Sequence, residues 1–358
     1  MPYSPAPSPS LHGRGARNLP GLGVSVGLAV ISTVIGGVVP LVGSAVPGIV
    51  LGVLLGIVRK PGPRLTPGIT FASKFVLQLS VVILGLQLSI GEVARVGLES
   101  LPVMLGTLVV CLGAAWLFGR LLGVIGDVRT LIGVGTGICG ASAVAAVAPV
   151  IGAVSADVAY AVSTIFLFNV AAVIVFPVVG HALGMSQHAF GLFAGTAVND
   201  TSSVVAAAST YGSEAANDAV VVKLVRTLMI IPISIGLAAL VARTGPTRQP
   251  AATDEQSVAG PAPARMTPRR ALRLVPWFLV GFVTMALINS TGLIPTAAHP
   301  ALSALSTFLI AVALSAIGLS TDIRALRRAG ARPLLLGALL WITVSVTSVA
   351  LQWVTGTL

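Results

Sequence analysis

The sequence predicts an all-α polytopic membrane protein with about 11 transmembrane spans (10–11), in an inverted-repeat transporter fold with broken helices. Of 358 residues, 55% are hydrophobic and only 9% are charged, too few to cover a globule that faces water. The apolar residues form runs of about 20, the length with which a helix crosses the hydrocarbon core. Two of these runs also resemble each other, which is the basis for the repeat.

The elements follow in order along the chain. Residues 1–19 are rich in Pro and Ser and are expected to form a disordered cytoplasmic tail. The predicted spans then cover 20–39, 43–58, 70–90, 100–119, 130–151, 157–180, 188–211, 218–242, 274–293, 299–321 and 333–354. The second span is short and contains Pro47 and Gly48, so it is expected to be tilted, kinked or re-entrant. A re-entrant segment anywhere would lower the number of crossings.

Residues 243–273 form the only long polar stretch inside the chain and are expected to be a flexible cytoplasmic linker. This linker separates a membrane region of eight spans (20–242) from one of three spans (274–358). Neither the tail nor the linker is long enough for a further domain of its own.

Positive charge predicts the orientation. Of the 21 Lys and Arg residues, 17 fall in segments on one side of this span map, and only Arg95 falls on the other. Because cytoplasmic loops collect positive charge, we expect a multi-pass protein of the plasma or inner membrane, with its N-terminus inside and its C-terminus outside. The net charge of +11 is then an orientation signal, so the expected partner is the lipid bilayer and not nucleic acid.

Two segments repeat at an offset of 60 residues. GTGICGASAVAAV begins at Gly135 and GTAVNDTSSVVAA begins at Gly195, and the alignment places Ser142 over Ser202. A weaker match at offset 233 lays Gly-Leu of 85–86 over Gly-Leu of 318–319 and Gly97 over Gly330, in spans that the map sends in opposite directions. Inverted repeats of this kind are typical of secondary transporters.

The stretch GVGTGICGAS (133–142) matches both the dinucleotide fingerprint GxGxxG and the spacing of a phosphate-binding loop. Ala141 stands where that loop needs Lys, and apolar flanks replace the expected βα unit, so neither a nucleotide site nor an ATP-driven pump is predicted. The glycines instead favour a broken helix, since each costs about 1 kcal/mol relative to Ala. A half-helix beginning near Ala141 or Thr201 would aim its positive end at an anion.

Two alternatives remain open for these segments. Gly, Ala and Ser at such spacing also let helices pack closely, without any binding role. The pattern also does not distinguish an unwound crossing helix from a re-entrant hairpin.

Charged side chains inside spans are the strongest single-residue signals, because each costs about 2.5–3.5 kcal/mol to insert. Asp200 lies near the middle of the seventh span, and Lys223 and Arg226 share one face of the eighth. In one interpretation the cations bind an anionic substrate and Asp200 is the ion-coupling residue for H⁺ or Na⁺. In the other, a buried salt bridge only fixes helix register.

The predicted substrate-binding residues lie on the two repeats and on the cationic face: Gly135, Thr136, Gly137, Cys139, Gly140, Ser142, Gly195, Thr196, Asn199, Thr201, Ser202, Lys223 and Arg226. No metal ligand, catalytic residue or cofactor is predicted. His181 and His188 are interpreted as loop residues of a short cytoplasmic turn, and the role of Asn169, in a pathway or between helices, stays open.

Four motifs together resemble a known family. LIGVGTGICGASAVAAVAPVI, DVAYAVSTIFLFN, SQHAFGLFAGTAVNDTSSVVAAAS and AVVVKLVRTLMIIP are similar to the YeiH-type proteins, which carry the label of sulfate exporters. The resemblance runs from about Gly48 to the C-terminus. It implies kinship with the transporters that include bile-acid/sodium symporters and cation/proton antiporters, and by analogy an elevator-type motion and a homodimer.

The sequence therefore predicts a secondary active transporter of a small anion, either sulfate or a related sulfur oxyanion or organic sulfonate, coupled to H⁺ or Na⁺. The alternative is a cation/proton antiporter that uses Asp200. An enzyme is not predicted, because the chain contains no HExxH motif and no convincing pair of nucleophile and base.

Overall fold

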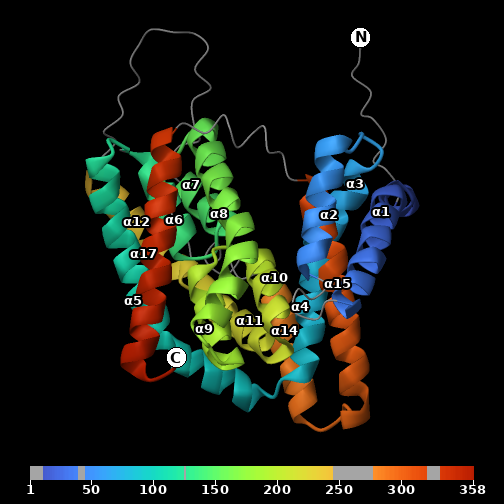
Figure 1. Cartoon of the computed structure of the whole chain (residues 1–358). Helices are drawn as coiled ribbons and strands as arrows, with labels where there is room; N and C mark the ends of the chain where they lie inside the picture. Colours follow the sequence, from blue (N-terminus) through green and yellow to red (C-terminus); the bar gives the residue numbers. More distant parts are fainter. Residues whose placement is uncertain (1–10, 39–44, 125, 245–276, 321–330) are drawn as a thin grey trace, which may run out of the picture. The chain divides into compact units, whose positions relative to one another are not determined.

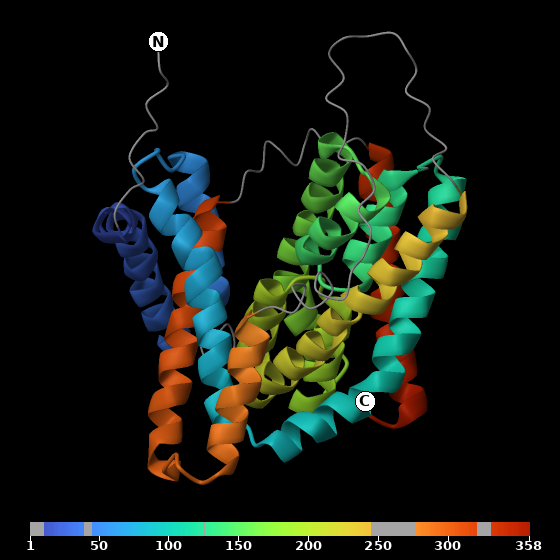
Figure 2. The same ribbon diagram turned by 180° about the vertical axis from the view of Figure 1, so that it is seen from behind.

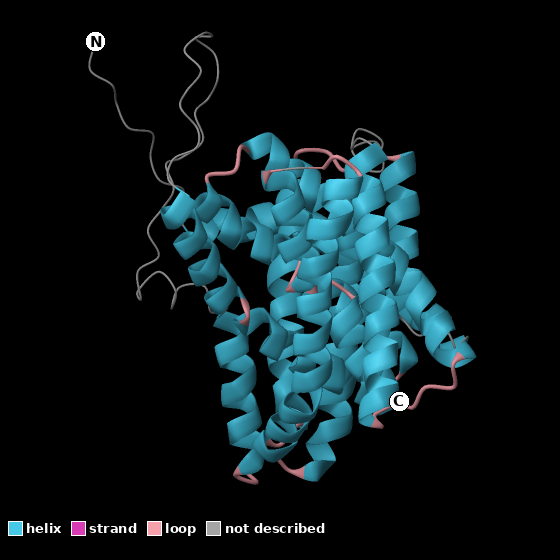
Figure 3. Ribbon diagram, turned by 90° about the vertical axis from the view of Figure 1, so that its left-hand side faces the viewer, coloured by secondary structure: helices cyan, strands magenta, loops and turns pink. Residues whose placement is uncertain are grey.

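The protein is a polytopic, all-helical membrane protein. The computed structural model describes residues 11–38, 45–124, 126–244, 277–320 and 331–358, and these ranges contain helices and no strand (Figure 3). Seven described helical stretches are long and apolar enough to cross a membrane: Arg17–Val38, Thr66–Gln87, Ile90–Leu121, Ala156–Ala182, Ser213–Val241, His299–Ser320 and Ala331–Thr355. The predicted class of an all-α polytopic membrane protein is therefore confirmed.

The helices run in chain order as α1 (Leu11–Val38), α2 (Ala45–Val58), α3 (Thr66–Phe71), a π-helical turn η1 (Ala72–Val76), α4 (Leu77–Leu84), a short 3₁₀ turn η2 (Gly85–Gln87), α5 (Ile90–Leu121), α6 (Asp127–Gly137), α7 (Ala141–Ile151), α8 (Ser155–Ala182), α9 (Gln187–Ala197), α10 (Thr201–Tyr211), α11 (Ser213–Leu228), α12 (Ile230–Thr244), α14 (Trp277–Ser290), η3 (Thr296–Ala298), α15 (His299–Ser320) and α17 (Ala331–Thr355). Helix α1 extends into the predicted tail. Most of the predicted linker, and Gly330 of the weaker repeat, lie outside the described residues.

The chain divides into two compact units. The first contains residues 1–81 and 300–323, and the second contains residues 82–299 and 324–358. Small residues bring helices of the first unit together: a methyl group on Gly21 of α1 would lie 2.9 Å from the Cα of Gly68, and one on Gly52 of α2 would lie 3.0 Å from the Cα of Gly318. Close packing through small residues is thus a structural device of the first unit.

The second unit is built from a repeated pair of elements, a long helix followed by a helix hairpin. Helix α5 precedes α6 and α7, and α8 precedes α9 and α10. We call residues 127–151 the first hairpin and residues 187–211 the second hairpin. The ring of Phe190, near the start of α9, stacks on Tyr211 at the end of α10 with centroids 3.9 Å apart, whereas a continuous helix would separate them by about 32 Å.

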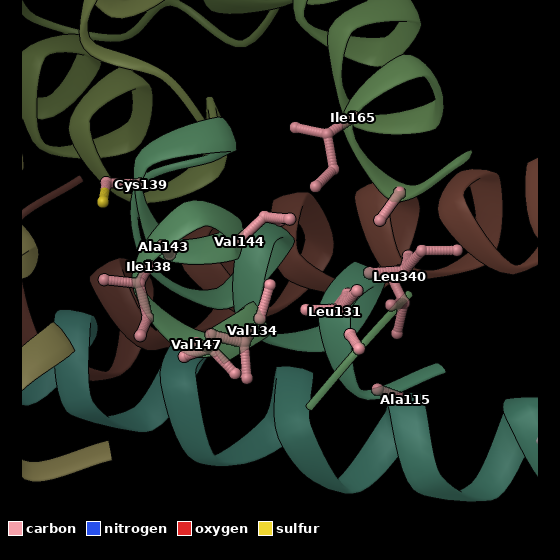
Figure 4. Packing of buried hydrophobic residues seen from close by; sticks show 14 of the residues in the cluster. Ala115, Leu131, Val134, Ile138, Cys139, Ala143, Val144, Val147, Ile165 and Leu340 are labelled. Carbon is pink, nitrogen blue, oxygen red and sulfur yellow. The ribbon is translucent and has the colours of Figure 1, made fainter. Parts of the chain in front are cut away.

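The first hairpin folds back in the same way. A methyl group on Gly135 of α6 would lie 2.9 Å from the Cγ2 of Val144 in α7, and the N–H of Gly140 donates to the carbonyl of Gly135 over 2.8 Å. Val134 and Val147 belong to one buried apolar cluster and lie close together in Figure 4. This cluster holds the two short helices side by side.

The two hairpins approach each other from opposite ends of the second unit. Helix α8 has 28 residues, about 42 Å, and joins the end of the first hairpin to the start of the second (Figure 1). The tips nevertheless touch, because a methyl group on Gly140 would lie 3.2 Å from the Cβ of Asp200. Each repeat is therefore inverted relative to the other, and the breaks meet in the interior.

This arrangement answers the question that the sequence leaves open at the fifth and seventh predicted spans. Both are hairpins that return to the end from which they start, and their second helices begin at Ala141 and Thr201, as predicted. The predicted cytoplasmic turn at 181–188 needs correction: His181 stacks on Tyr211, so this turn lies at the same end as residue 212 and not across the membrane from it. Helices α11 and α12 follow each other as one kinked helical stretch that runs alongside the hairpins (Figure 2).

Candidate substrate site at the hairpin tips

The first hairpin turns at a glycine. Helix α6 ends at Gly137, and Gly140 has a φ of +68° and a ψ of −134°, a conformation that residues with a Cβ rarely adopt. The N-cap residue Gly140 has no side chain that could cap the following helix, and the first two residues of that helix, Ala141 and Ser142, are exposed. The N-terminus of α7 therefore presents backbone N–H groups that lack an intrahelical acceptor.

The second hairpin turns at a carboxylate. Asp200 caps α10: its carboxylate accepts from the N–H of Ser203 over 2.9 Å and from the Ser203 hydroxyl over 2.8 Å, and the Ser202 hydroxyl donates to it as well. Such caps typically stabilise a helix by about 1 kcal/mol. Asp200 and its neighbours Thr201 and Ser202 are partly exposed.

The two repeats thus differ at equivalent positions. The offset of 60 that aligns Gly135 with Gly195 also aligns Gly140 with Asp200. One hairpin carries its own anionic cap, whereas the other has glycine and no capping side chain. Because a helix N-terminus attracts negative charge, the start of α7 is the place where an external anion could take the part that Asp200 plays in the second hairpin.

Two fully buried basic side chains bind the ends of the helices that precede the breaks. The ammonium of Lys223 donates to the carbonyl of Ile138 over 3.0 Å and to that of Val198 over 2.6 Å, so it ties both tips together. The Nε of Arg226 donates to the carbonyl of Gly137 over 2.8 Å. These carbonyls lie at the C-terminal ends of α6 and α9, where the helix dipole favours a cation.

The predicted salt-bridge alternative does not occur. Within the described residues, neither Lys223 nor Arg226 lies within 4.0 Å of a carboxylate oxygen. Two nitrogens of Arg226, Nη1 and Nη2, are buried without a hydrogen-bond acceptor. Buried donors without partners are costly, so this guanidinium has unused capacity for a water molecule or an anion.

The remaining predicted residues lie behind the tips. Gly135, Thr136 and Gly195 are buried within helices, and Thr196 donates to the carbonyl of Leu192 over 2.7 Å and contacts the hydroxyl of Ser348. Their surroundings are those of tightly packed helix contacts.

Two further predicted residues sit in the turns and are also buried. Cys139 is a free thiol, and its side chain does not pair with Cys111. The N–H of Asn199 donates to the side-chain oxygen of Asn169 over 3.1 Å, so Asn169 of α8 bonds the turn of the second hairpin. The accessible members of the predicted site are consequently Ser142, Thr201 and Ser202 with Asp200.

Sequence reasoning missed the cluster around His188. This residue lies in the first turn of α9, with Nδ1 2.6 Å from a carboxylate oxygen of Asp218 and Nε2 3.7 Å from one of Glu99. The three residues are far apart in the sequence, so only the folding of the second hairpin against α5 and α11 brings them together.

The comparisons with known proteins agree on a family. The sequence profile of the family described as "Conserved hypothetical protein 698" matches residues 20–337. The chain belongs to this family. Three similar relatives each carry the name "UPF0324 membrane protein", which states no activity.

The similarity to these relatives extends over nearly the whole chain. The protein from Clostridium tetani is 39% identical over 82% of this chain and 84% of the relative. The protein from Streptococcus agalactiae serotype V is 38% identical over 95% and 98%, and the one from Streptococcus pneumoniae serotype 4 is 39% identical over 95% and 98%. No solved structure matches this chain.

Proposed function

We propose that this membrane protein is a secondary active transporter of a small anion. The observation that carries the proposal is that the second helices of the two hairpins begin differently. The side chain of Asp200 caps α10, whereas α7 follows Gly140, which has no capping side chain, and begins with exposed residues. Paired helix breaks in the interior of inverted repeats are the arrangement in which transporters bind substrates. The uncapped tip favours negative charge.

The buried cations support an anion over a cation as the substrate. Lys223 and Arg226 place an amine and a guanidinium in the interior of the second unit, and the carboxylate at the tips is that of Asp200. The unpartnered nitrogens of Arg226 add donors of the kind that bind oxyanions. The anion would rest on the N–H groups of Ala141 and Ser142, with the hydroxyls of the exposed tip residues around it.

The closeness of Asp200 to that site offers a route to coupling. An anion at the start of α7 and a charged Asp200 carboxylate repel each other, since Gly140 is packed against Asp200. Binding of the anion therefore favours a protonated Asp200, and by reciprocity a proton on Asp200 favours the anion. This predicts that the anion and the coupling ion, H⁺ or Na⁺, move in the same direction.

The resemblance to the YeiH-type proteins narrows the proposed substrate to sulfate, a related sulfur oxyanion or an organic sulfonate. Kinship with bile-acid/sodium symporters and cation/proton antiporters would fit the inverted hairpins, and a homodimer in the plasma membrane with a cytoplasmic N-terminus remains part of the same proposal. Substrate and direction are open to a direct test.

The test is uptake of radiolabelled sulfate, sulfite, thiosulfate and small sulfonates into proteoliposomes with an imposed pH or Na⁺ gradient. We expect saturable flux of one of these anions, driven by an inward proton gradient and strongly reduced in Arg226→Ala that still inserts in the membrane. Absence of flux for every anion, with intact protein in the vesicles, would contradict the proposal.

The partly exposed carboxylate at the tips favours one second candidate, a cation/proton antiporter in which Asp200 is the carrier. Asp200→Asn separates the two, because Asn still caps a helix but cannot carry a proton. An antiporter loses all exchange in this variant, as reported by a pH-sensitive dye. An anion carrier keeps exchange of labelled anion and loses only its dependence on the proton gradient.

A further inference from the structure

We propose that His188, Asp218 and Glu99 form a second proton-binding site, which clamps the base of the second hairpin when His188 is charged. The three residues come from α9, α11 and α5, so the site joins the hairpin to two long helices of the second unit. It lies at the open end of the hairpin, 12 residues from Asp200 along the chain. It is thus separate from the tips.

The geometry fits one histidine between two carboxylates. The Nδ1 of His188 is 2.6 Å from Asp218, a hydrogen-bond distance, and its Nε2 is 3.7 Å from Glu99, an ion-pair distance. Only a doubly protonated imidazole can offer an N–H toward both partners at once. The side chains are 29% exposed for His188, 10% for Asp218 and 41% for Glu99, so solvent protons reach the site while Asp218 anchors it.

The helices packed against α9 carry the titratable groups nearest to His188. Helix α11 contributes Asp218 and Glu214, and α5 contributes Glu99 and Arg95 near its first turns. Helix α10 contributes Tyr211, and the described part of α17, which also packs on α9, has Arg332 as its sole charged residue, at its opposite end. Three carboxylates against one arginine leave a net negative surrounding that attracts an imidazolium ion.

The sign of the pH dependence follows from the charge of the histidine. Histidine side chains gain and lose their proton between about pH 5 and pH 8. The charged ring attracts both carboxylates, whereas the neutral ring keeps one hydrogen bond and loses the attraction to Glu99. The base of the hairpin is therefore held more tightly at low pH and opens more readily at high pH.

Glycine packing explains why the clamp would act on the whole hairpin. Gly191, one turn beyond His188, is so close to α11 that a methyl group on it would lie 2.8 Å from the Cβ of Asp218. The N–H of Glu214, in the first turn of α11, donates to the side-chain oxygen of Gln187 over 3.1 Å. The base of the second hairpin therefore cannot move without disturbing the close packing of α9 on α11.

The experiment is hydrogen exchange of the full chain in lipid nanodiscs at pH 6 and pH 8, corrected for the intrinsic pH dependence of exchange. For the peptide that covers residues 186–193, we expect wild-type exchange to be about fivefold slower at pH 6, the factor that about 1 kcal/mol of ion pairing gives. In His188→Gln the exchange should be equal at the two pH values. The control His181→Gln, at the same end but without a carboxylate partner, should keep the wild-type ratio.

Glu99→Gln provides a second variant. Because Glu99 is exposed, this substitution should leave the protein folded even if a substitution of His188 does not. We expect this variant to lose at least half of the pH effect. Equal exchange of the wild type at both pH values, or a wild-type ratio retained in His188→Gln and Glu99→Gln, would overturn the proposal. The role of this proton in a transport cycle rests on the proposed function, but the exchange experiment uses no substrate, so its outcome is independent of the flux assay.

Discussion

At the residue scale, the cations and the carboxylate that the sequence singles out have different partners from those expected of a salt bridge. Lys223 binds the carbonyls of Ile138 and Val198, and Asp200 binds the hydroxyls and the N–H group at the start of its own helix. A helix that breaks in the membrane interior leaves carbonyls without intrahelical donors, and lipid offers no donor in their place. Lys223 supplies that missing donor at both breaks.

Lys223→Met is predicted to destabilise the protein. Methionine has a similar shape but no donor, so the carbonyls of Ile138 and Val198 lose their partner, at a cost of about 1–3 kcal/mol for each group. Thermal unfolding in detergent, followed by the fluorescence of a thiol-reactive dye on the buried cysteines, should show a lower Tm. The matched control is Lys74→Met, which changes an exposed lysine within the first unit. Equal shifts in the two variants would refute the anchoring role.

The sequence pointed to these residues but not to their partners. The insertion cost of a charge identifies Asp200, Lys223 and Arg226 from the sequence alone, because no other property of an apolar span would retain them. Which acceptor a long side chain reaches depends on where the breaks lie in space. His188 and Asp218 gave no signal at all, since each sits near a span end, where polar residues are ordinary.

At the element scale, each hairpin depends on its turn, and the two turns are built differently. Gly140 takes a positive φ, whereas Asp200 lies in the extended region with φ −102° and uses its side chain to begin α10. The sequence predicted both helix starts, because Gly and a capping Asp are strong local signals. It could not predict the fold-back, since an apolar run of 22–24 residues has the same composition whether it crosses or returns.

Gly140→Ala is predicted to disturb the first hairpin. The backbone at this position suits glycine almost alone, at a cost of about 1–3 kcal/mol for another residue, and the new methyl group would lie 3.2 Å from the Cβ of Asp200. Gly113→Ala in α5 is the control, because that position is helical and has no atom within 4 Å of the added group. Unfolding in detergent should separate the two, with a lower Tm in the first and an unchanged or raised Tm in the second. A Gly140→Ala protein as stable as the control would show that the turn is not strained.

At the scale of the whole molecule, the hairpins change the path of the chain without changing the side of any positive charge. Two paths of the chain can be compared, one with the hairpins and one in which every predicted span crosses the membrane. Only residues 152–154 and 183–186 lie on different sides in the two paths, and neither segment contains Lys or Arg. The distribution of 17 positive residues is therefore the same for both paths. This is why the orientation rule could not reveal the hairpins.

Cysteine accessibility distinguishes the two paths. In a background with Cys111 and Cys139 replaced by Ala, single cysteines are placed at exposed positions: Leu121 and Ala156 at the base of the first hairpin, and Leu183 and Glu214 at the base of the second.

With hairpins, α8 is the only crossing between these bases, so a membrane-impermeant maleimide applied to intact cells should label the cysteines at 183 and 214 alike. Those at 121 and 156 should react alike with each other and oppositely to that pair. If every predicted span crossed, the cysteine at 156 would share a side with that at 214, and the one at 183 with that at 121. The second pattern would refute the opposed hairpins, and with them the meeting of the tips on which the proposed anion site depends.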